Sequence, residues 1–151
     1  MDQDVSLDNF KAFQIQPVFN ASDKPVKQDI MAFLTFYLKE QFKVQNLPLT
    51  DTQQTKSKIL MVQSNILVYE PARSSGNLNI AMGGTGTTRL VRCILRTDLI
   101  DKSTNKVVAK ILTIKEVGVG TMGYETHEWI LKESAAAVAK EVAQMMQSNV
   151  P

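Results

Sequence analysis

The amino-acid sequence predicts an α+β fold, a two-layer sandwich in which two helices cover one face of a mostly antiparallel sheet of about four strands. Three observations predict it. Three β-rich segments follow one another directly, two other segments have the apolar spacing of amphipathic helices, and strands do not alternate regularly with helices. The predicted order is strand, helix, three strands and helix (βαβββα).

The first part of the chain supplies one strand and one helix. Residues 10–19 alternate apolar and polar side chains, which is typical of a strand with one buried face. Residues 20–23 then favour a turn and a helix cap, and Pro25 suits the first helical position because its missing N–H needs no partner there. Helical spacing continues to Val44, and Pro48 disfavours a continuation. We therefore expect a helix over residues 25–44.

Three further strands are predicted in the middle of the chain. Residues 59–69, 89–98 and 107–117 are rich in Val, Ile and Leu, which are typical strand residues. The polar residues 101–106 join the last two segments and have the composition of a hairpin turn. Residues 71–86 contain many glycines and serines, and we expect a mobile loop there.

A second helix closes the chain. Thr126 is suited to cap it, and we expect Trp129 to anchor its first turn by packing. Alanines at positions 135–137 and 139 keep the helix slim, so that it fits closely on a sheet. The predicted inner stripe consists of Ile130, Val138, Val142 and Met145.

Length and composition indicate a single domain over residues 1–151, with residues 1–9 as a flexible N-terminal segment. Of the 151 residues 44% are hydrophobic and 21% charged, which is typical of a globular chain. The net charge of +2 is too weak for the electrostatic footprint of a nucleic-acid-binding protein. One Cys and one His provide too few ligands for a common zinc site, so we expect no metal.

A glycine motif lies between the last predicted strand and the last helix. Gly118, Gly120 and Gly123 match the G-x-G-x-x-G pattern of dinucleotide-binding folds. That pattern requires a following parallel strand with an acidic residue about twenty positions on, which holds the ribose. Here the following helix is the last element and Glu141 falls inside it. We therefore interpret the motif as a strand-to-helix connection and expect no cofactor.

A second glycine-rich stretch contains Gly83, Gly84 and Gly86. Backbone N–H groups of such a loop can cradle a phosphate. The stretch lacks the lysine of a P-loop and leads into a strand, which favours a simple loop or strand entry.

Two arginines of the strand at residues 89–98 form the most specific charged feature. Alternation places Arg92 and Arg96 on the same face, with Arg89 on the other. Two arginines on one face are able to hold a phosphate, a carboxylate or an acidic partner. Solvent-facing strands also carry arginines for solubility and edge protection. Both interpretations stay open at this point.

The sequence contains no coherent catalytic set. His127 has acidic neighbours in Glu125 and Glu128, but no nucleophile stands in a recognisable motif beside them. Cys93 lies between the apolar residues Val91 and Leu95 of one strand face, which is typical of a buried, inert thiol. We therefore expect a protein that is not an enzyme.

Several short segments resemble a family of bacterial envelope lipoprotein domains of unknown function. The resemblance is carried by residues 75–77, 83–89 and 91–95, by Asp98, and by the turn at 103–108. The closing helix at 133–146 is similar too, so that the resemblance covers residues 10–146. The architecture is also similar to the small α/β domains of the TolB N-terminal region and of CsgG-type secretion lipoproteins. The sequence departs from the family in showing no export signal and no lipid-bearing cysteine at its start.

The resemblance implies a periplasmic, outer-membrane-associated domain whose signal and lipid anchor were removed. Such a domain acts by binding another envelope protein or by forming a homo-oligomer, without a cofactor, nucleic acid or catalytic residues. The alternative is a small-molecule or nucleotide binder that uses residues 118–123 or the Arg92/Arg96 face, and a cytoplasmic location also stays open. The candidate partner-binding residues are Gly83, Gly84, Gly86, Arg92, Arg96, Gly118, Gly120 and Gly123.

Overall fold

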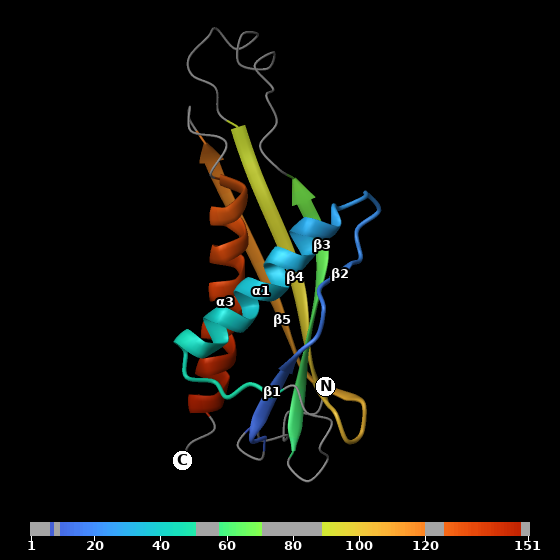
Figure 1. The fold of residues 1–151 in the computed structure, drawn as a ribbon, viewed down its shortest axis with the longest axis vertical. Helices are drawn as coiled ribbons and strands as arrows, with labels where there is room; N and C mark the ends of the chain where they lie inside the picture. Colours follow the sequence, from blue (N-terminus) through green and yellow to red (C-terminus); the bar gives the residue numbers. More distant parts are fainter. Residues whose placement is uncertain (1–6, 8–9, 51–57, 71–88, 120–125, 149–151) are drawn as a thin grey trace, which may run out of the picture.

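A computed structural model describes residues 7, 10–50, 58–70, 89–119 and 126–148. Within this part of the chain two helices lie across one face of a tall, twisted sheet (Figure 1), and the predicted two-layer α+β sandwich is confirmed. The elements are β1 (Ala12–Ile15), β2 (Phe19–Asn20), α1 (Gln28–Val44), β3 (Ile59–Glu70), β4 (Arg89–Asp101), β5 (Lys106–Val119) and α3 (Thr126–Ser148).

The sheet has the strand order β1-β3-β4-β5, and β2 also pairs with β3. The three long strands β3, β4 and β5 are antiparallel, as predicted, whereas the short strands β1 and β2 run parallel to β3. A tight turn joins β4 to β5, and in it Asn105 has a φ of 60°, a left-handed conformation that asparagine tolerates well. The predicted hairpin is therefore confirmed.

The single strand predicted over residues 10–19 is wrong, because the structure divides it into β1 and β2. Pro17 lies between them, and a proline has no N–H to donate to a neighbouring strand. The next residue, Val18, donates its N–H to Thr35 Oγ1 of α1 at 3.0 Å rather than to a strand. The chain therefore leaves the sheet for one contact with the helix and then returns to β3.

Helix α1 begins at Gln28, later than the predicted start at residue 25. The residues expected to cap it bond among themselves, since Ser22 Oγ donates to Asn20 Oδ1 at 2.6 Å and Asn20 Nδ2 donates to the Lys24 carbonyl at 2.8 Å. The predicted end at Val44 is confirmed. There the Leu47 N–H donates to the Phe42 carbonyl at 2.9 Å, which satisfies one of the last carbonyls of the helix.

The hydrophobic core fills the layer between the helices and the sheet. Phe13 of β1 packs edge to face on Phe42 of α1, with ring centroids 5.5 Å apart. The predicted inner stripe of α3 is confirmed, although Met145 is only partly buried. The side chains with no exposed surface include Leu34, Leu38, Val62, Ile66, Val91, Leu95, Leu99, Ile130, Val138 and Val142.

The two edges of the sheet differ. At β1 the Phe13 N–H donates to the Pro48 carbonyl at 2.8 Å, and the Thr50 N–H donates to the Phe13 carbonyl at 2.9 Å. The segment after α1 therefore covers this edge. At the other side, β5 has a neighbouring strand on one side only, as far as the described residues extend. This edge is free.

Candidate functional site

The face of the sheet that points away from the helices carries exposed and half-buried side chains among the described residues. Alternation along β4 turns Val91, Cys93 and Leu95 toward the helices, where they are fully buried. Arg92 and Arg96 therefore lie together on the opposite face, as the sequence predicts. We call this surface the open face.

On the open face both arginines have carboxylate partners. Arg92 stands in register between Glu70 of β3 and Glu116 of β5. Its Nε lies 2.8 Å from Glu116 Oε1, and its Nη1 lies 3.6 Å from Glu70 Oε1. Arg96 Nε lies 3.7 Å from Asp98 Oδ1 on the same strand. A phosphate would have to compete with these carboxylates, which disfavours an anion site on this face.

Apolar side chains are exposed at both ends of the open face. Phe19 of β2 is 61% exposed, and in β5 Leu112 and Ile114 are 61% and 54% exposed. Large exposed side chains that share a face are typical of surfaces that bind other proteins. In β5 they lie directly at the free edge.

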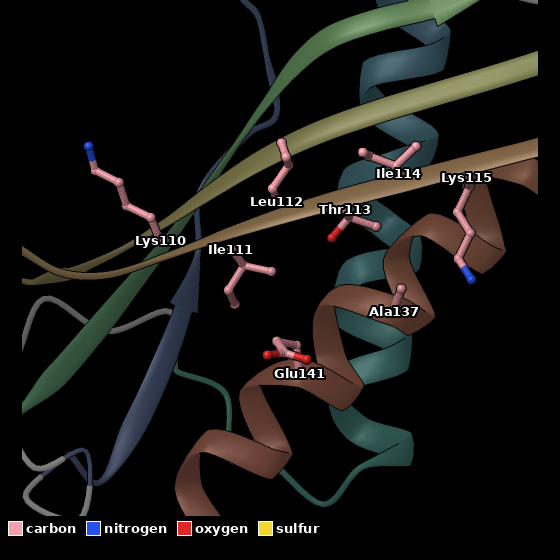
Figure 2. A pocket seen from close by; sticks show the side chains of 8 residues that line it. All are labelled: Lys110, Ile111, Leu112, Thr113, Ile114, Lys115, Ala137 and Glu141. Carbon is pink, nitrogen blue, oxygen red and sulfur yellow. The ribbon is translucent and has the colours of Figure 1, made fainter.

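A groove runs along this edge between β5 and α3. Figure 2 shows Ile111 and Thr113 pointing from β5 toward the helix, while Leu112 and Ile114 point to the other side. From α3, Ala137 and Glu141 face the strand. The groove has a volume of about 350 Å³.

Cys93 and Tyr69 lie on the side of the sheet that the helices cover. Cys93 has no exposed surface, and burial raises the pKa of its thiol to about 11, so the thiolate is scarce at neutral pH. Burial likewise raises the pKa of the neighbouring Tyr69 to about 12. Within the described residues no group of three His, Cys, Asp or Glu side chains is arranged to hold a metal ion. The predicted buried thiol is confirmed.

Most of the glycines proposed as partner-binding residues lie outside the described residues, namely Gly83, Gly84, Gly86, Gly120 and Gly123. Gly118 belongs to β5 and pairs with Leu90 of β4. The first glycine of the G-x-G-x-x-G pattern is therefore part of a strand. The predicted packing anchor Trp129 is 45% exposed, which corrects that expectation.

Sequence reasoning missed the carboxylates beside Arg92 and the free edge of β5. The carboxylates come from other strands, so only the register brings them together. The edge did have a signal in the sequence. Ile111, Leu112 and Ile114 place apolar residues on both faces of one strand, although only one face is covered by helices.

No protein-family model and no curated protein matches the sequence. Solved structures do match the fold. A protein of Xanthomonas campestris from the family DUF330 has a TM-score of 0.62 at 11% identity, over 93% of this chain and 87% of that one. A PelC dodecamer of Paraburkholderia phytofirmans has a TM-score of 0.60 at 9% identity, over 94% and 92%. A minor lipoprotein of Acinetobacter baumannii has a TM-score of 0.52 at 15% identity, over 93% and 94%.

At these identities the likeness shows a shared fold, one that occurs in bacterial lipoproteins and in a family of unknown function. The fold expected from the lipoprotein resemblance is thereby supported. Similarity to the TolB and CsgG-type domains stays a prediction. Neither helix of the described chain has the length and apolar character needed to cross a bilayer.

Proposed function

We propose that this chain is a non-enzymatic assembly domain of the bacterial cell envelope, derived from a lipoprotein, that works through contacts with other protein chains. The observation that carries the proposal is the free edge of β5, where Leu112 and Ile114 are exposed beside a groove. An edge strand with apolar side chains is a surface that a partner strand extends.

The structural neighbours support this proposal at the level of the fold. One neighbour is a lipoprotein and another forms a dodecamer. A fold that forms a dodecamer in one of these neighbours supports assembly as a role here. The periplasmic, outer-membrane-associated location and the lipid anchor belong to this proposal.

The location is tested on the full product of the native gene. We expect radiolabelled palmitate in the protein and recovery with the outer-membrane fraction, because a lipid chain together with a second membrane contact anchors a protein stably. A periplasmic protein and a known lipoprotein from the same cells serve as fractionation controls. An unlabelled product confined to the cytoplasm would contradict the envelope assignment.

The assembly role is tested by capture from envelope extracts with the purified chain as bait. We expect specific partners that are lost when Leu112 and Ile114 are both replaced by Asp. The matched control replaces Phe36 by Asp, since this side chain is 55% exposed on α1 and far in sequence from the free edge. Equal recovery by both variants would contradict a role for the β5 edge in binding these partners.

The small-molecule alternative stays a separate prediction that a thermal-shift screen against nucleotides and acidic metabolites tests. A ligand at 100 times its dissociation constant stabilises a protein by about 2.7 kcal/mol, which shifts the melting temperature measurably. Because carboxylates already neutralise Arg92 and Arg96, we expect no stabilisation by these ligands. A reproducible shift that is lost in Arg92→Ala would favour the alternative.

A further inference from the structure

We infer that the free edge of β5 binds the same edge of a second copy of this chain, so that two sheets join into one. This inference rests on the proposed function, because it names the partner and the register of an assembly surface. β5 is the longest described strand, with 14 residues, and its outer backbone groups offer a template for an antiparallel partner. The other edge is covered at Phe13 and does not offer this template.

The side chains of the open face select one register. If a twofold axis perpendicular to the sheet passes through Thr113, Lys110 of one copy lies opposite Glu116 of the second copy. The same register places Leu112 opposite Ile114 of the second copy. All four side chains are exposed on the open face, so the paired strands gain opposite charges outside and an apolar contact at the centre. Twofold symmetry repeats each pair.

The helix side of the sheet agrees with this register. Lys115 of the second copy lies opposite Ile111, and Figure 2 shows Glu141 of α3 beside Ile111. Directly opposite residues have Cβ atoms about 5 Å apart, so the long Lys115 side chain of the second copy reaches Glu141. Neither residue has an ion-pair partner among the described residues of its own chain. Two kinds of charge pair on opposite faces therefore require the same alignment.

There is room for the second copy. Helix α3 packs on both β4 and β5, so its axis lies inside the edge rather than over it. Two copies of α3 are then about two strand spacings apart, roughly 10 Å, which is close to the usual distance between packed helices. At the groove α3 presents the short side chain of Ala137. The helices therefore flank the joined edges without blocking them.

The first experiment is a charge exchange at Lys115 and Glu141, read by sedimentation equilibrium of the purified chain. We expect Lys115→Glu and Glu141→Lys each to raise the dimer dissociation constant about tenfold, because each substitution places like charges together at two symmetric sites. The double variant restores opposite charges and returns the dissociation constant to near the parent value. Lys27→Glu, on the exposed N-terminal side of α1, is the matched control and leaves it unchanged.

The second experiment tests the register by disulfide formation. Leu112→Cys and Ile114→Cys chains are oxidised separately and as a mixture. In the inferred register the two new thiols face each other only in mixed dimers, whereas in each single variant they lie on the diagonal, about 7–8 Å apart, which is too far for a disulfide. Cys93 is buried and serves as the internal control, because the parent chain forms no cross-link.

Three results would overturn the inference. They are a monomer at every concentration tested, a double charge variant no tighter than the singles, and a Leu112→Cys chain that cross-links by itself as efficiently as the mixture. A chain that stays monomeric but still captures an envelope partner through Leu112 and Ile114 would refute self-association and leave the proposed function standing. A chain that neither self-associates nor captures an envelope partner through Leu112 and Ile114 would refute both proposals.

Discussion

Ser64 and Thr97 share a hydrogen bond of 2.8 Å between their side-chain oxygens, on the side of the sheet that the helices cover. The two residues lie directly opposite each other in β3 and β4, and neither has exposed surface. Each hydroxyl thus satisfies the other within the core. A buried hydroxyl that loses its partner costs more than the bond itself contributes.

This pair gives the first prediction. Ser64→Ala leaves the Thr97 hydroxyl unpaired, and we expect the free energy of unfolding to fall by about 1–3 kcal/mol. The double variant with Thr97→Val leaves no hydroxyl to satisfy and loses less than the sum of the two single variants. Urea denaturation of all four proteins measures the coupling. Strictly additive losses would show that the two hydroxyls act independently.

Cys93 gives a prediction about alkaline pH. Burial raises the pKa of its thiol to about 11, whereas an unfolded thiol has a pKa of about 8.5. Between these values the unfolded chain releases the proton and the folded chain keeps it, so the free energy of unfolding falls as the pH rises. The loss amounts to at most about 3 kcal/mol, and below the unfolded pKa the thiol contributes no pH dependence.

The measurement compares the urea midpoints of the parent chain and of Cys93→Ala from neutral pH upward. Burial and the neighbouring Cys93 raise the pKa of Tyr69 to about 12, above that of the thiol, so up to about pH 11 the difference between the two proteins reports mainly on the thiol. We expect the two curves to converge as the pH rises. If the two curves stay parallel up to pH 11, the buried thiol does not cause the loss of stability at alkaline pH.

The contact between Phe13 and Phe42 gives a prediction about the core. Phe42 has no exposed surface, and Phe42→Ala creates a cavity between α1 and β1. We expect a loss of about 3–5 kcal/mol in the free energy of unfolding. Phe36→Ala on the same helix is the control, because this ring is largely exposed, and it loses less than about 1 kcal/mol. Similar losses in both variants would be inconsistent with the described packing.

The turn between β4 and β5 gives a prediction about backbone conformation. Asn105 has a φ of 60°, where a β-carbon is unfavourable and branched side chains are worst. We expect Asn105→Gly to keep full stability and Asn105→Val to lose about 1–2 kcal/mol. Lys102→Val, in the same turn but at a residue without positive φ, controls for the change of side chain. Thermal unfolding measures all three, and equal melting temperatures for the Gly and Val variants would rule out strain at this position.

Periodicity carried most of the fold prediction. The three long strands and both helices have clear spacing, and all five form in the predicted regions, although α1 begins three residues late. The parallel pairing of β1 and β2 with β3 was not predictable in this way, because alternation shows which face of a strand is buried but not which strand lies beside it. The error in the predicted first residue of α1 has a different cause. Asn20 and Ser22 are cap-forming residues, and here they close a turn of their own.

Alternation along a strand also made part of the candidate site predictable. Alternation placed Arg92 and Arg96 on one face correctly. The two partners of Arg92, Glu70 and Glu116, come from neighbouring strands, and one shift in register would have separated them from it. The charge pairs of Arg92, which disfavour an anion site, are therefore a property of the assembled sheet.

The covered edge at β1 also limits how large a strand-to-strand assembly becomes. Segment 48–50 occupies the outer backbone groups of Phe13, so a further strand cannot pair with β1 at this residue. Once two β5 strands have paired, each outer end of the joined sheet carries β1, covered at Phe13, and the two-residue strand β2. Growth into a fibre by strand addition is thereby disfavoured at the β1 end of each copy. Any larger ring would have to be built from pairs that meet through other surfaces.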